Sequence, residues 1–443
     1  MTSQAPVTYD QILAGDGWPV PDDLRSHLGT TLSGAAIPVE YYTSRRVHEL
    51  ERECLWSRVW QMACREEHIP EVGDHVVYDI AGRSYLIVRS APDEIKAFPN
   101  ACLHRGRQLK SYAGRCAEIR CPFHGFTWLL DGRLKRVPAP WEFPHVEPED
   151  WCLPTVQVGT WGGFVFINPD RQAPPLTEHL GVLPAHFRRW AYEDRYVEAH
   201  AAKVVRANWK IAQEAFMESL HVASTHPQVA AYSGDVVTQV DTWENVSRAI
   251  TPSEVTSPLL GQAADDETML RATFDVRLDE DLAFHLADGQ TARQAIVAAT
   301  REQWRAYLGD RIDHWSPADL IDNFVYTVFP NLHPWGGVHK ICYRFRPNGD
   351  DHRSSIMEVF VLAPFRGDRP PPAPLRWLED HEAWSDAPEL GILGKVFDQD
   401  MNNMEGTQVG CESTVRSHAE LAAYQENKLR WFYARYEQLL ETG

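Results

Sequence analysis

CLHRG (residues 102–106) and CPFHG (residues 121–125) are the two short segments that decide the fold of this 443-residue chain. Each segment offers one cysteine and one histidine, spaced as Cys-x-His in the first and as Cys-x-x-His in the second. Two thiolates and two imidazoles can hold a 2Fe–2S cluster, with both cysteines on one iron and both histidines on the other. The segments therefore predict an electron-transfer centre held by paired loops.

The candidate ligands of this centre are two cysteines and two histidines: Cys102, His104, Cys121 and His124. The same donors could hold structural zinc, because two Cys and two His satisfy a tetrahedral site. Gly106 and Gly125 favour the cluster, because they close the loops where backbone N–H groups must approach sulfur. Each loop also contributes one histidine, whereas a zinc finger usually groups its histidines on a helix. On these residues the cluster is favoured and zinc stays the alternative.

The residues around the two segments form short β-like runs separated by turn residues such as Gly73-Asp74 and Asp131-Gly132. They predict a small antiparallel β domain over residues 46–172. A helix at 44–60 and an N-terminal arm at 1–45, which packs on the second domain, precede its strands. The predicted strands cover 75–80, 85–89, 95–99, 126–130 and 163–167.

Beyond about residue 175 the sequence changes to longer helical patterns mixed with strands, so residues 173–443 are predicted to form a second, α+β domain with helices on a largely antiparallel sheet. The predicted strands cover 273–277, 323–328, 341–346 and 355–363. The predicted helices cover 208–225, 303–308, 390–405 and 413–440.

The second domain carries a candidate iron site. Glu218 and His221 are three residues apart and share a face of the predicted helix, whereas His226 is five residues beyond His221. Pro227 disfavours helical geometry at His226, so the second histidine is expected just past the helix end. Two converging histidines need one carboxylate to complete a facial triad for Fe(II).

The carboxylate is predicted to come from residues 397–405, where three acidic residues compete for the role: Asp398, Asp400 and Glu405. Three further histidines are rival ligands but lack a partner at comparable spacing: His333, His339 and His352.

The chain is acidic, with 62 Asp and Glu against 43 Lys and Arg and a formal net charge of −19. This charge argues against nucleic acid or an anionic membrane as a partner. No stretch approaches the roughly 20 apolar residues that cross a bilayer, and the N-terminus lacks a secretory pattern. We expect a cytoplasmic protein whose eight cysteines do not form a disulfide scaffold.

Taken together, these motifs resemble the terminal oxygenase alpha subunit of the Rieske non-haem iron oxygenases, the aromatic-ring-hydroxylating dioxygenase family. The resemblance covers about residues 40–430. It rests on CLHRG, on CPFHG with its trailing FTW, on NWK followed by H-x4-H, and on the late D-x4-E. It implies a Rieske 2Fe–2S domain followed by a helix-grip catalytic domain with mononuclear Fe(II).

Carried over by position, the resemblance implies seven metal ligands. Asp400 completes the triad because it lies five residues before Glu405. Glu218 matches the acidic residue that bridges the two centres of neighbouring subunits in a head-to-tail homotrimer, here from His221 to His124 of the partner subunit. The cluster ligands are Cys102, His104, Cys121 and His124, and the iron ligands are His221, His226 and Asp400.

The resemblance also implies an activity. By this resemblance the chain is expected to take electrons from NAD(P)H through a separate reductase, with or without a ferredoxin, to pass them from the cluster to Fe(II), and to use O₂ to hydroxylate a small organic substrate. No Gly-x-Gly-x-x-Gly fingerprint is found in the chain itself.

Two aromatic-rich segments, 216–222 and 323–335, predict an apolar pocket and hence an apolar aromatic or alicyclic substrate. A monooxygenase or demethylase acting on a quaternary ammonium or N/O-methyl compound is the alternative, because relatives of that kind also carry Glu at the bridge and the H-x4-H spacing. Ala215 and Leu220 depart from the residues common in relatives, which leaves the substrate class open. A Rieske electron carrier without oxygenase activity is the alternative of another class.

Overall fold

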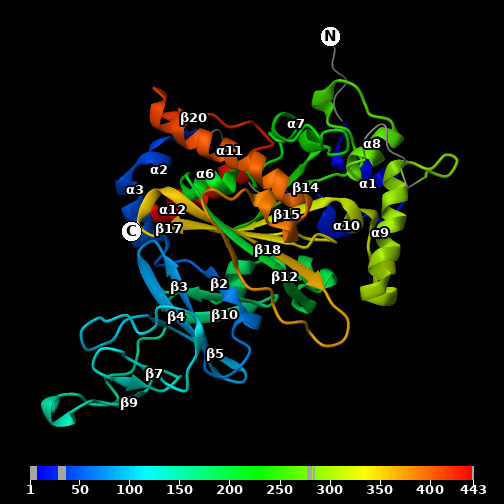
Figure 1. Ribbon diagram of the computed structural model, residues 1–443. Helices are drawn as coiled ribbons and strands as arrows, with labels where there is room; N and C mark the ends of the chain where they lie inside the picture. Colours follow the sequence, from blue (N-terminus) through cyan, green and yellow to red (C-terminus); the bar gives the residue numbers. More distant parts are fainter. Residues whose placement is uncertain (1–6, 28–35, 277–281, 283–284, 442–443) are drawn as a thin grey trace.

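The chain folds as an α+β protein in two parts, as the sequence predicts (Figure 1). The structure is a computed structural model that describes residues 7–27, 36–276, 282 and 285–441. Three small sheets form the first part, and a larger sheet covered by helices forms the second. The predicted domain boundaries at 45 and 172 remain predictions.

An eight-stranded sheet is the centre of the second part. Its neighbouring strands pair antiparallel, except that β12 and β19 run parallel. Across the sheet the strands are β13 (Gln239–Thr242), β14 (Val246–Thr251), β15 (Asn323–Val328), β16 (Leu332–Pro334), β17 (Ile341–Asn348), β18 (Asp351–Pro364), β12 (Arg195–Val205) and β19 (Arg376–Leu378).

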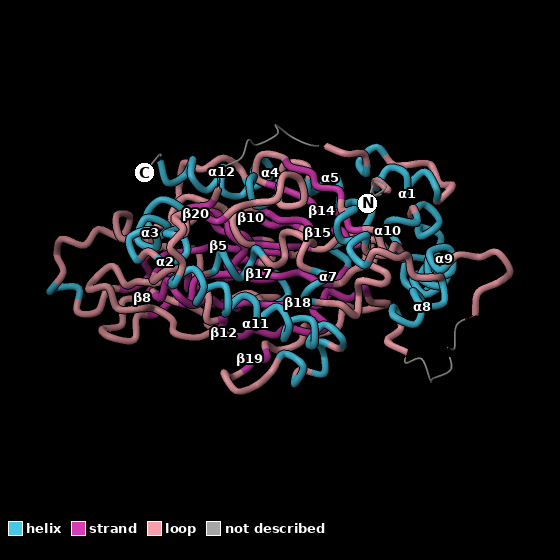
Figure 2. The backbone as a smooth tube through the Cα atoms, turned by 90° about the horizontal axis from the view of Figure 1, so that it is seen from above, coloured by secondary structure: helices cyan, strands magenta, loops and turns pink. Residues whose placement is uncertain are grey.

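Helices α6 (Trp209–Glu214) and α11 (Ile392–Ser413) lie on one face of this sheet (Figure 1), and the view from above shows α11 beside β12 (Figure 2). α6 packs on β17 and β18, and α11 packs on α6. This face therefore holds the segments in which the candidate iron ligands lie. The other α-helices are α1 (Tyr9–Gly15), α2 (Glu40–Thr43), α3 (Arg45–Leu50), α4 (Leu176–Leu180), α5 (Leu183–Phe187), α7 (Val222–Thr225), α8 (Asp266–Thr273), α9 (Ala292–Leu308), α10 (Pro317–Ile321) and α12 (Asn427–Glu441).

The first part lies on the opposite side of the eight-stranded sheet from α11 (Figure 1). The CLHRG loop follows β5, and the CPFHG loop joins β7 to β8. Figure 1 shows β7 at the end of this part that is remote from the eight-stranded sheet. The strands are β2 (Gln61–Arg65), β3 (Asp74–Ile80), β4 (Arg83–Ala91), β5 (Glu94–Pro99), β6 (Gly114–Arg115), β7 (Ile119–Arg120), β8 (Thr127–Trp128), β9 (Leu134–Arg136), β10 (Gln157–Trp161) and β11 (Phe164–Asn168).

The predicted helix at 208–225 is wrong as a single helix, because the chain forms α6 and then α7 with an irregular segment between them. Glu218 explains the break. Its carboxylate accepts hydrogen bonds from the backbone N–H groups of Leu220 and His221. A side chain that binds nearby backbone in this way competes with helical hydrogen bonding.

The predicted strand at 273–277 is also wrong over its described residues. Thr273 is the last residue of α8 (Asp266–Thr273), and residues 274–276 form no strand; residue 277 lies outside the described part of the chain. Asp265 accepts the N–H of Thr268 at 2.8 Å and so caps the start of this helix. The predicted helix at 413–440 begins only at Asn427. His418–Ala419 instead form β20, which pairs with β1 (Ile37–Pro38) of the N-terminal arm.

Other predicted elements exist with different limits. The helix predicted at 303–308 is the end of α9, which starts at Ala292 because Thr291 and Gln294 form a capping box. The helix predicted at 44–60 is shorter: α3 ends at Leu50, and a wider π-helical turn follows it over Glu51–Leu55. Five strands of the large sheet were not predicted: β12, β13, β14, β16 and β19.

A buried network fixes α6 against its surroundings. Glu51 pairs with Lys210, and it accepts hydrogen bonds from Trp209 Nε1 at 2.9 Å and from Tyr436 Oη at 2.6 Å. Glu51 and Lys210 are both fully buried. The network joins the turn after α3 to α6 and to α12, and thus holds the start of the segment that leads to His221.

Replacing Lys210 with Met is expected to lower the free energy of unfolding by about 3–5 kcal/mol, because it leaves the Glu51 carboxylate buried without its cation. Urea denaturation followed by circular dichroism measures this loss. The double variant Glu51→Gln/Lys210→Met carries no buried charge and should lose less than Lys210→Met alone. Equal losses in the two variants would show that the ion pair is not what Lys210 contributes.

Candidate metal centres and their cavity

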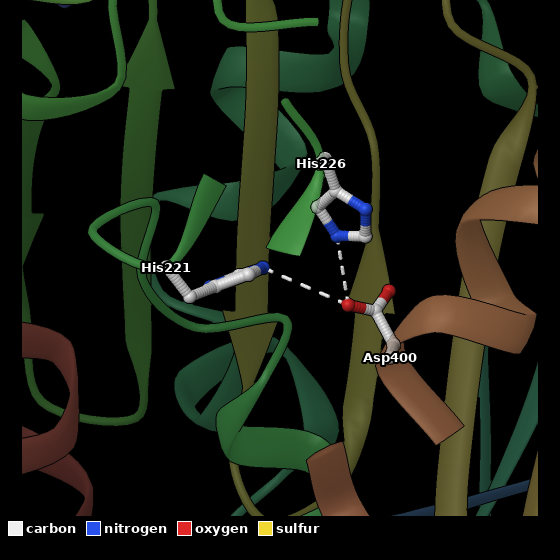
Figure 3. Close-up of side chains that lie close together, drawn as sticks. All are labelled: His221, His226 and Asp400. Carbon is white, nitrogen blue, oxygen red and sulfur yellow. Dashed lines mark hydrogen bonds and ion pairs between the residues drawn. The ribbon is translucent and has the colours of Figure 1, made fainter. Parts of the chain in front are cut away.

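His221, His226 and Asp400 converge on one point from two elements (Figure 3). His221 directly precedes α7, His226 directly follows it, and Asp400 lies within α11. His226 Nε2 is 2.8 Å from Asp400 Oδ1, and His221 Nε2 is 3.7 Å from the same oxygen. One ligand atom from each residue lies within 4.8 Å of the others, a spacing that suits a single metal ion.

The local backbone explains why two histidines five residues apart can meet. His226 has φ −122° and ψ 59°, outside helical geometry, and Pro227 follows it. The predicted position of His226 past a helix end is therefore confirmed. His221 lies before the short helix α7, not on a long helix from residue 208 as predicted.

The competing carboxylates are bound elsewhere. Asp398 accepts the N–H of Trp384 at 2.7 Å and the hydroxyl of Ser385 at 2.6 Å. Glu405 accepts the N–H of Arg206 at 3.2 Å. Since residues 398 and 400 are two apart on α11, their side chains point to different sides of the helix.

The rival histidines also lie outside the triad. His333 hydrogen-bonds with Thr327 and Gln213, and His339 Nε2 lies 3.0 Å from the carbonyl of Asp322. Within the described part of the chain, neither these histidines nor His352 join three or more possible ligands around one point.

Two side chains orient the imidazole rings of the triad. His221 Nδ1 donates to Glu218 Oε1 at 2.5 Å, and His226 Nδ1 donates to Gln399 Oε1 at 2.8 Å. Both Nε2 atoms are thereby left free as metal ligands. Burial lowers the pKa of His221, but the hydrogen bond and charge of Glu218 and the charge of Asp400 raise the pKa above its ordinary value. Two such imidazoles and one carboxylate are the donor set of non-haem Fe(II), so these residues fit that ion.

The two Cys/His loops share one backbone geometry. Gly106 N–H donates to the carbonyl of Cys102 at 2.9 Å, and Gly125 N–H donates to the carbonyl of Cys121 at 3.1 Å. Gly106 has φ +71° and Gly125 has φ +81°, in the left-handed region that favours glycine. The glycines therefore let each loop turn tightly around its ligands.

The ligands of these loops pair by type. Cys102 and Cys121 are both buried, and the rings of His104 and His124 have centroids 4.9 Å apart. Burial raises the pKa of the Cys102 thiol, whereas the backbone N–H groups of His104 and Arg105, which donate to its sulfur, lower it. Backbone N–H groups directed at sulfur are typical of iron–sulfur ligands.

This arrangement weighs against zinc. A single zinc ion needs all its ligand atoms around one point. Here the Cys102 thiol interacts with that of Cys121, and the imidazole of His104 lies next to that of His124, a pairing by type that fits the two irons of a 2Fe–2S cluster.

A cavity of about 480 Å³ opens beside the triad, and all three triad residues line it. Its walls are mainly apolar and include Phe216, Trp335 and Tyr343. Both aromatic-rich segments predicted from the sequence contribute to the lining. In the second segment, however, several aromatic side chains pack in the core instead: Phe324, Tyr326 and Phe329.

Comparison with protein families decides what these features belong to. Residues 185–442, more than half of the chain, match the ring hydroxylating alpha subunit (catalytic domain), and residues 59–150 match the Rieske [2Fe-2S] domain. The chain belongs to the Rieske non-haem iron oxygenase alpha subunits. Its cofactors are the Rieske 2Fe–2S cluster and a mononuclear iron at the His221, His226 and Asp400 triad.

Curated relatives of this alpha subunit act on different compounds. It is 28% identical over 195 residues to the glycine betaine monooxygenase oxygenase subunit of Pseudomonas aeruginosa, over 44% of this chain and 45% of the relative. It is 29% identical over 220 residues to the anthranilate 1,2-dioxygenase large subunit of Acinetobacter baylyi, over 46% of this chain and 47% of the relative. The chain thus spans about half the length of the curated relatives it matches.

The fold is also that of a solved structure, a quaternary ammonium Rieske monooxygenase. The TM-score is 0.65 at 18% sequence identity, and the match covers 92% of this chain and 96% of the other.

Rieske oxygenases take electrons from a reductase. Within the described residues, no helix of this alpha subunit is both long enough and apolar enough to cross a bilayer.

Sequence reasoning missed Gln399, which holds His226 and receives a second hydrogen bond from Gln228 Nε2 at 2.8 Å. The only signal in the sequence was its place next to Asp400. Of the two departures from the residues common in relatives, Ala215 lines the cavity, whereas Leu220 is exposed at the surface. Ala215 is therefore the departure that bears on the substrate.

Proposed function

We propose that this alpha subunit is a terminal oxygenase component that uses O₂ to hydroxylate an apolar aromatic or alicyclic substrate. NAD(P)H supplies the electrons through a separate reductase, directly or through a ferredoxin. The observation that carries the proposal is the iron triad in the wall of a mainly apolar cavity of about 480 Å³. Three protein ligands leave positions for O₂ that a closed structural site lacks.

The proposed cluster ligands are Cys102, His104, Cys121 and His124. When bound, the cluster and the iron supply one-electron transfer and the activation of O₂. The side chains of the chain bind the metals, orient the ligands and position the substrate. His221, His226 and Asp400 bind the iron, Glu218 and Gln399 fix the two imidazole rings, and the aromatic walls position the substrate and exclude water.

We further propose that Glu218 connects two subunits of a homotrimer. Within one chain, the CLHRG and CPFHG loops and the triad lie on opposite sides of the eight-stranded sheet (Figure 1). Glu218 accepts three hydrogen bonds, from His221 Nδ1 and from the N–H groups of Leu220 and His221, which leaves acceptor capacity on a carboxylate. His124 is exposed and could donate to Glu218 of the partner subunit.

A second candidate is a monooxygenase or demethylase acting on a quaternary ammonium or N/O-methyl compound. The names of the glycine betaine and carnitine relatives favour it. The aromatic rings of Phe216, Trp335 and Tyr343 could surround such a cation.

The test is incorporation of labelled oxygen. The purified alpha subunit, loaded with iron and supplied with a compatible reductase, NADH and ¹⁸O₂, should yield product that contains ¹⁸O. Apolar aromatic and alicyclic compounds form one substrate panel, and quaternary ammonium compounds form the other. Product only from the second panel would replace the first candidate by the second, and NADH oxidation without labelled product from either panel would contradict both.

A further inference from the structure

Glu254 lies in the wall of the substrate cavity, although no step described so far uses it. It lies three residues beyond the end of β14, and it is only 6% exposed. Its backbone has φ +55°, in the left-handed region that costs energy for a residue with a side chain. The fold therefore holds a buried carboxyl group at this wall in a strained conformation.

One oxygen of this carboxyl group is held and the other is free. Oε1 accepts a hydrogen bond from Thr273 Oγ1 at 2.8 Å. Oε2 is buried and has no hydrogen-bond partner among the residues that the structure describes. A buried acceptor without a donor is costly, and a bound ligand can supply the missing donor.

The cation whose charge acts on Glu254 is already bound to other acceptors. Arg293 is the neighbouring cation, but each of its five N–H groups already has an acceptor on Asp16, Asp322 or Ser253, at 2.7–3.1 Å. Burial raises the pKa of Glu254, and the charges of Asp266 and Asp322 raise it further, although Thr273 and Arg293 lower it.

A second cavity of about 430 Å³ shares Glu254 as a wall residue. Its charged lining residues are three acids and one base: Asp16, Glu254, Asp266 and Arg293. Glu254 thus lies between the two cavities, and the other charges of the second cavity add only a small long-range attraction for a cation in the first.

We propose that Glu254 binds a protonated amine of the substrate, whose N–H groups donate to Oε2. Tyr232 lines the same cavity, so its wall also offers an aromatic ring to a bound amine. Glu254 lies in the segment after β14, whereas the triad residues flank α7 or lie within α11. The inference rests on the proposed function, because the amine belongs to the molecule oxidised at the triad, and it narrows the substrate to an apolar skeleton with one N–H-bearing cation.

The experiment compares two ligands of nearly equal shape, 2-phenylethylamine and propylbenzene, by isothermal titration calorimetry with the iron-loaded alpha subunit. We expect the amine to bind more tightly than the hydrocarbon. Glu254→Gln should weaken amine binding about 10- to 100-fold, the range of a charge-assisted hydrogen bond. Propylbenzene binding should change less than about twofold, because it has no charge to lose.

Asp266→Asn is the matched control, because it removes a negative charge from the second cavity but does not line the first. It should leave amine binding within about threefold of the wild-type value. Glu254→Asp, which keeps the charge, should weaken amine binding less than Glu254→Gln does, and this comparison guards against a folding defect in one variant.

The inference would be overturned if the amine bound the wild-type protein no more tightly than propylbenzene, or if Glu254→Gln weakened both ligands equally. Calorimetry needs neither a reductase nor O₂. Amine selectivity that persists in a protein which makes no labelled product would therefore contradict the proposed function and leave the amine site intact.

Discussion

Replacing His226 with alanine is expected to abolish oxygenation and to remove one iron per chain. His226 Nε2 faces Asp400 Oδ1 at 2.8 Å. Because His226 is buried, a side chain from the protein surface cannot reach this position and replace it as a ligand. Two remaining ligands do not make the three-ligand set of this iron type. The loss is measured as ¹⁸O incorporation and as iron content, while the visible absorption of the Rieske cluster should stay unchanged.

His352→Ala is the matched control for this substitution, because His352 was a rival ligand in the sequence and lies outside the triad. It should retain its iron and its turnover. Normal iron content in His226→Ala, or equal iron loss in the two variants, would contradict the assignment of the triad.

Replacing Glu218 with Gln is expected to lower turnover about 10- to 100-fold while both metal centres stay loaded, the range found for residues that orient metal ligands. Gln keeps the length of the side chain but loses the charge that His221 Nδ1 meets at 2.5 Å. If Glu218 also joins subunits, the oxidation of pre-reduced cluster in the presence of substrate and O₂ should slow by a similar factor in stopped-flow absorbance.

Glu405→Gln serves as the control, because Glu405 is an acid on α11 whose carboxylate accepts the N–H of Arg206 and lies outside the triad. It should leave both iron content and cluster oxidation unchanged. Unchanged cluster oxidation in Glu218→Gln, or a trimer that mixes Glu218→Gln and wild-type chains without any effect, would contradict the connecting role.

Local chemistry made much of the site predictable. The spacing within CLHRG and CPFHG indicates paired ligands because each loop is short and closes on its own backbone, at Gly106 and at Gly125. His226 could be placed past a helix end because Pro227 restricts the residue before it. These are effects of neighbours in sequence, so the sequence alone carries them.

Tertiary contacts decided what the sequence left open. Asp398 and Asp400 are equivalent as residue types, and only the packing of α11 on α6 selects the one that faces the histidines. Glu254 gave no signal, because its significance lies in an oxygen without a donor inside a cavity that distant segments build.

The errors in secondary structure have two causes, one local and one tertiary. Residues 208–225 carry a helical pattern, but Glu218 binds backbone N–H groups and breaks it. Residues 414–426 do not continue a helix because His418–Ala419 pair with the N-terminal arm more than 370 residues away in sequence. Hydrophobic periodicity does not register the first interaction, although it is local, and the second lies outside any short window.

The most direct measurement of the central claim is the metal and sulfide content of the purified chain. A cluster and a separate iron in one alpha subunit predict three irons and two acid-labile sulfides per chain, and two irons with two sulfides in His226→Ala. Two irons in the wild-type chain, unchanged by that substitution, would describe an electron carrier. Zinc without sulfide would contradict the account altogether.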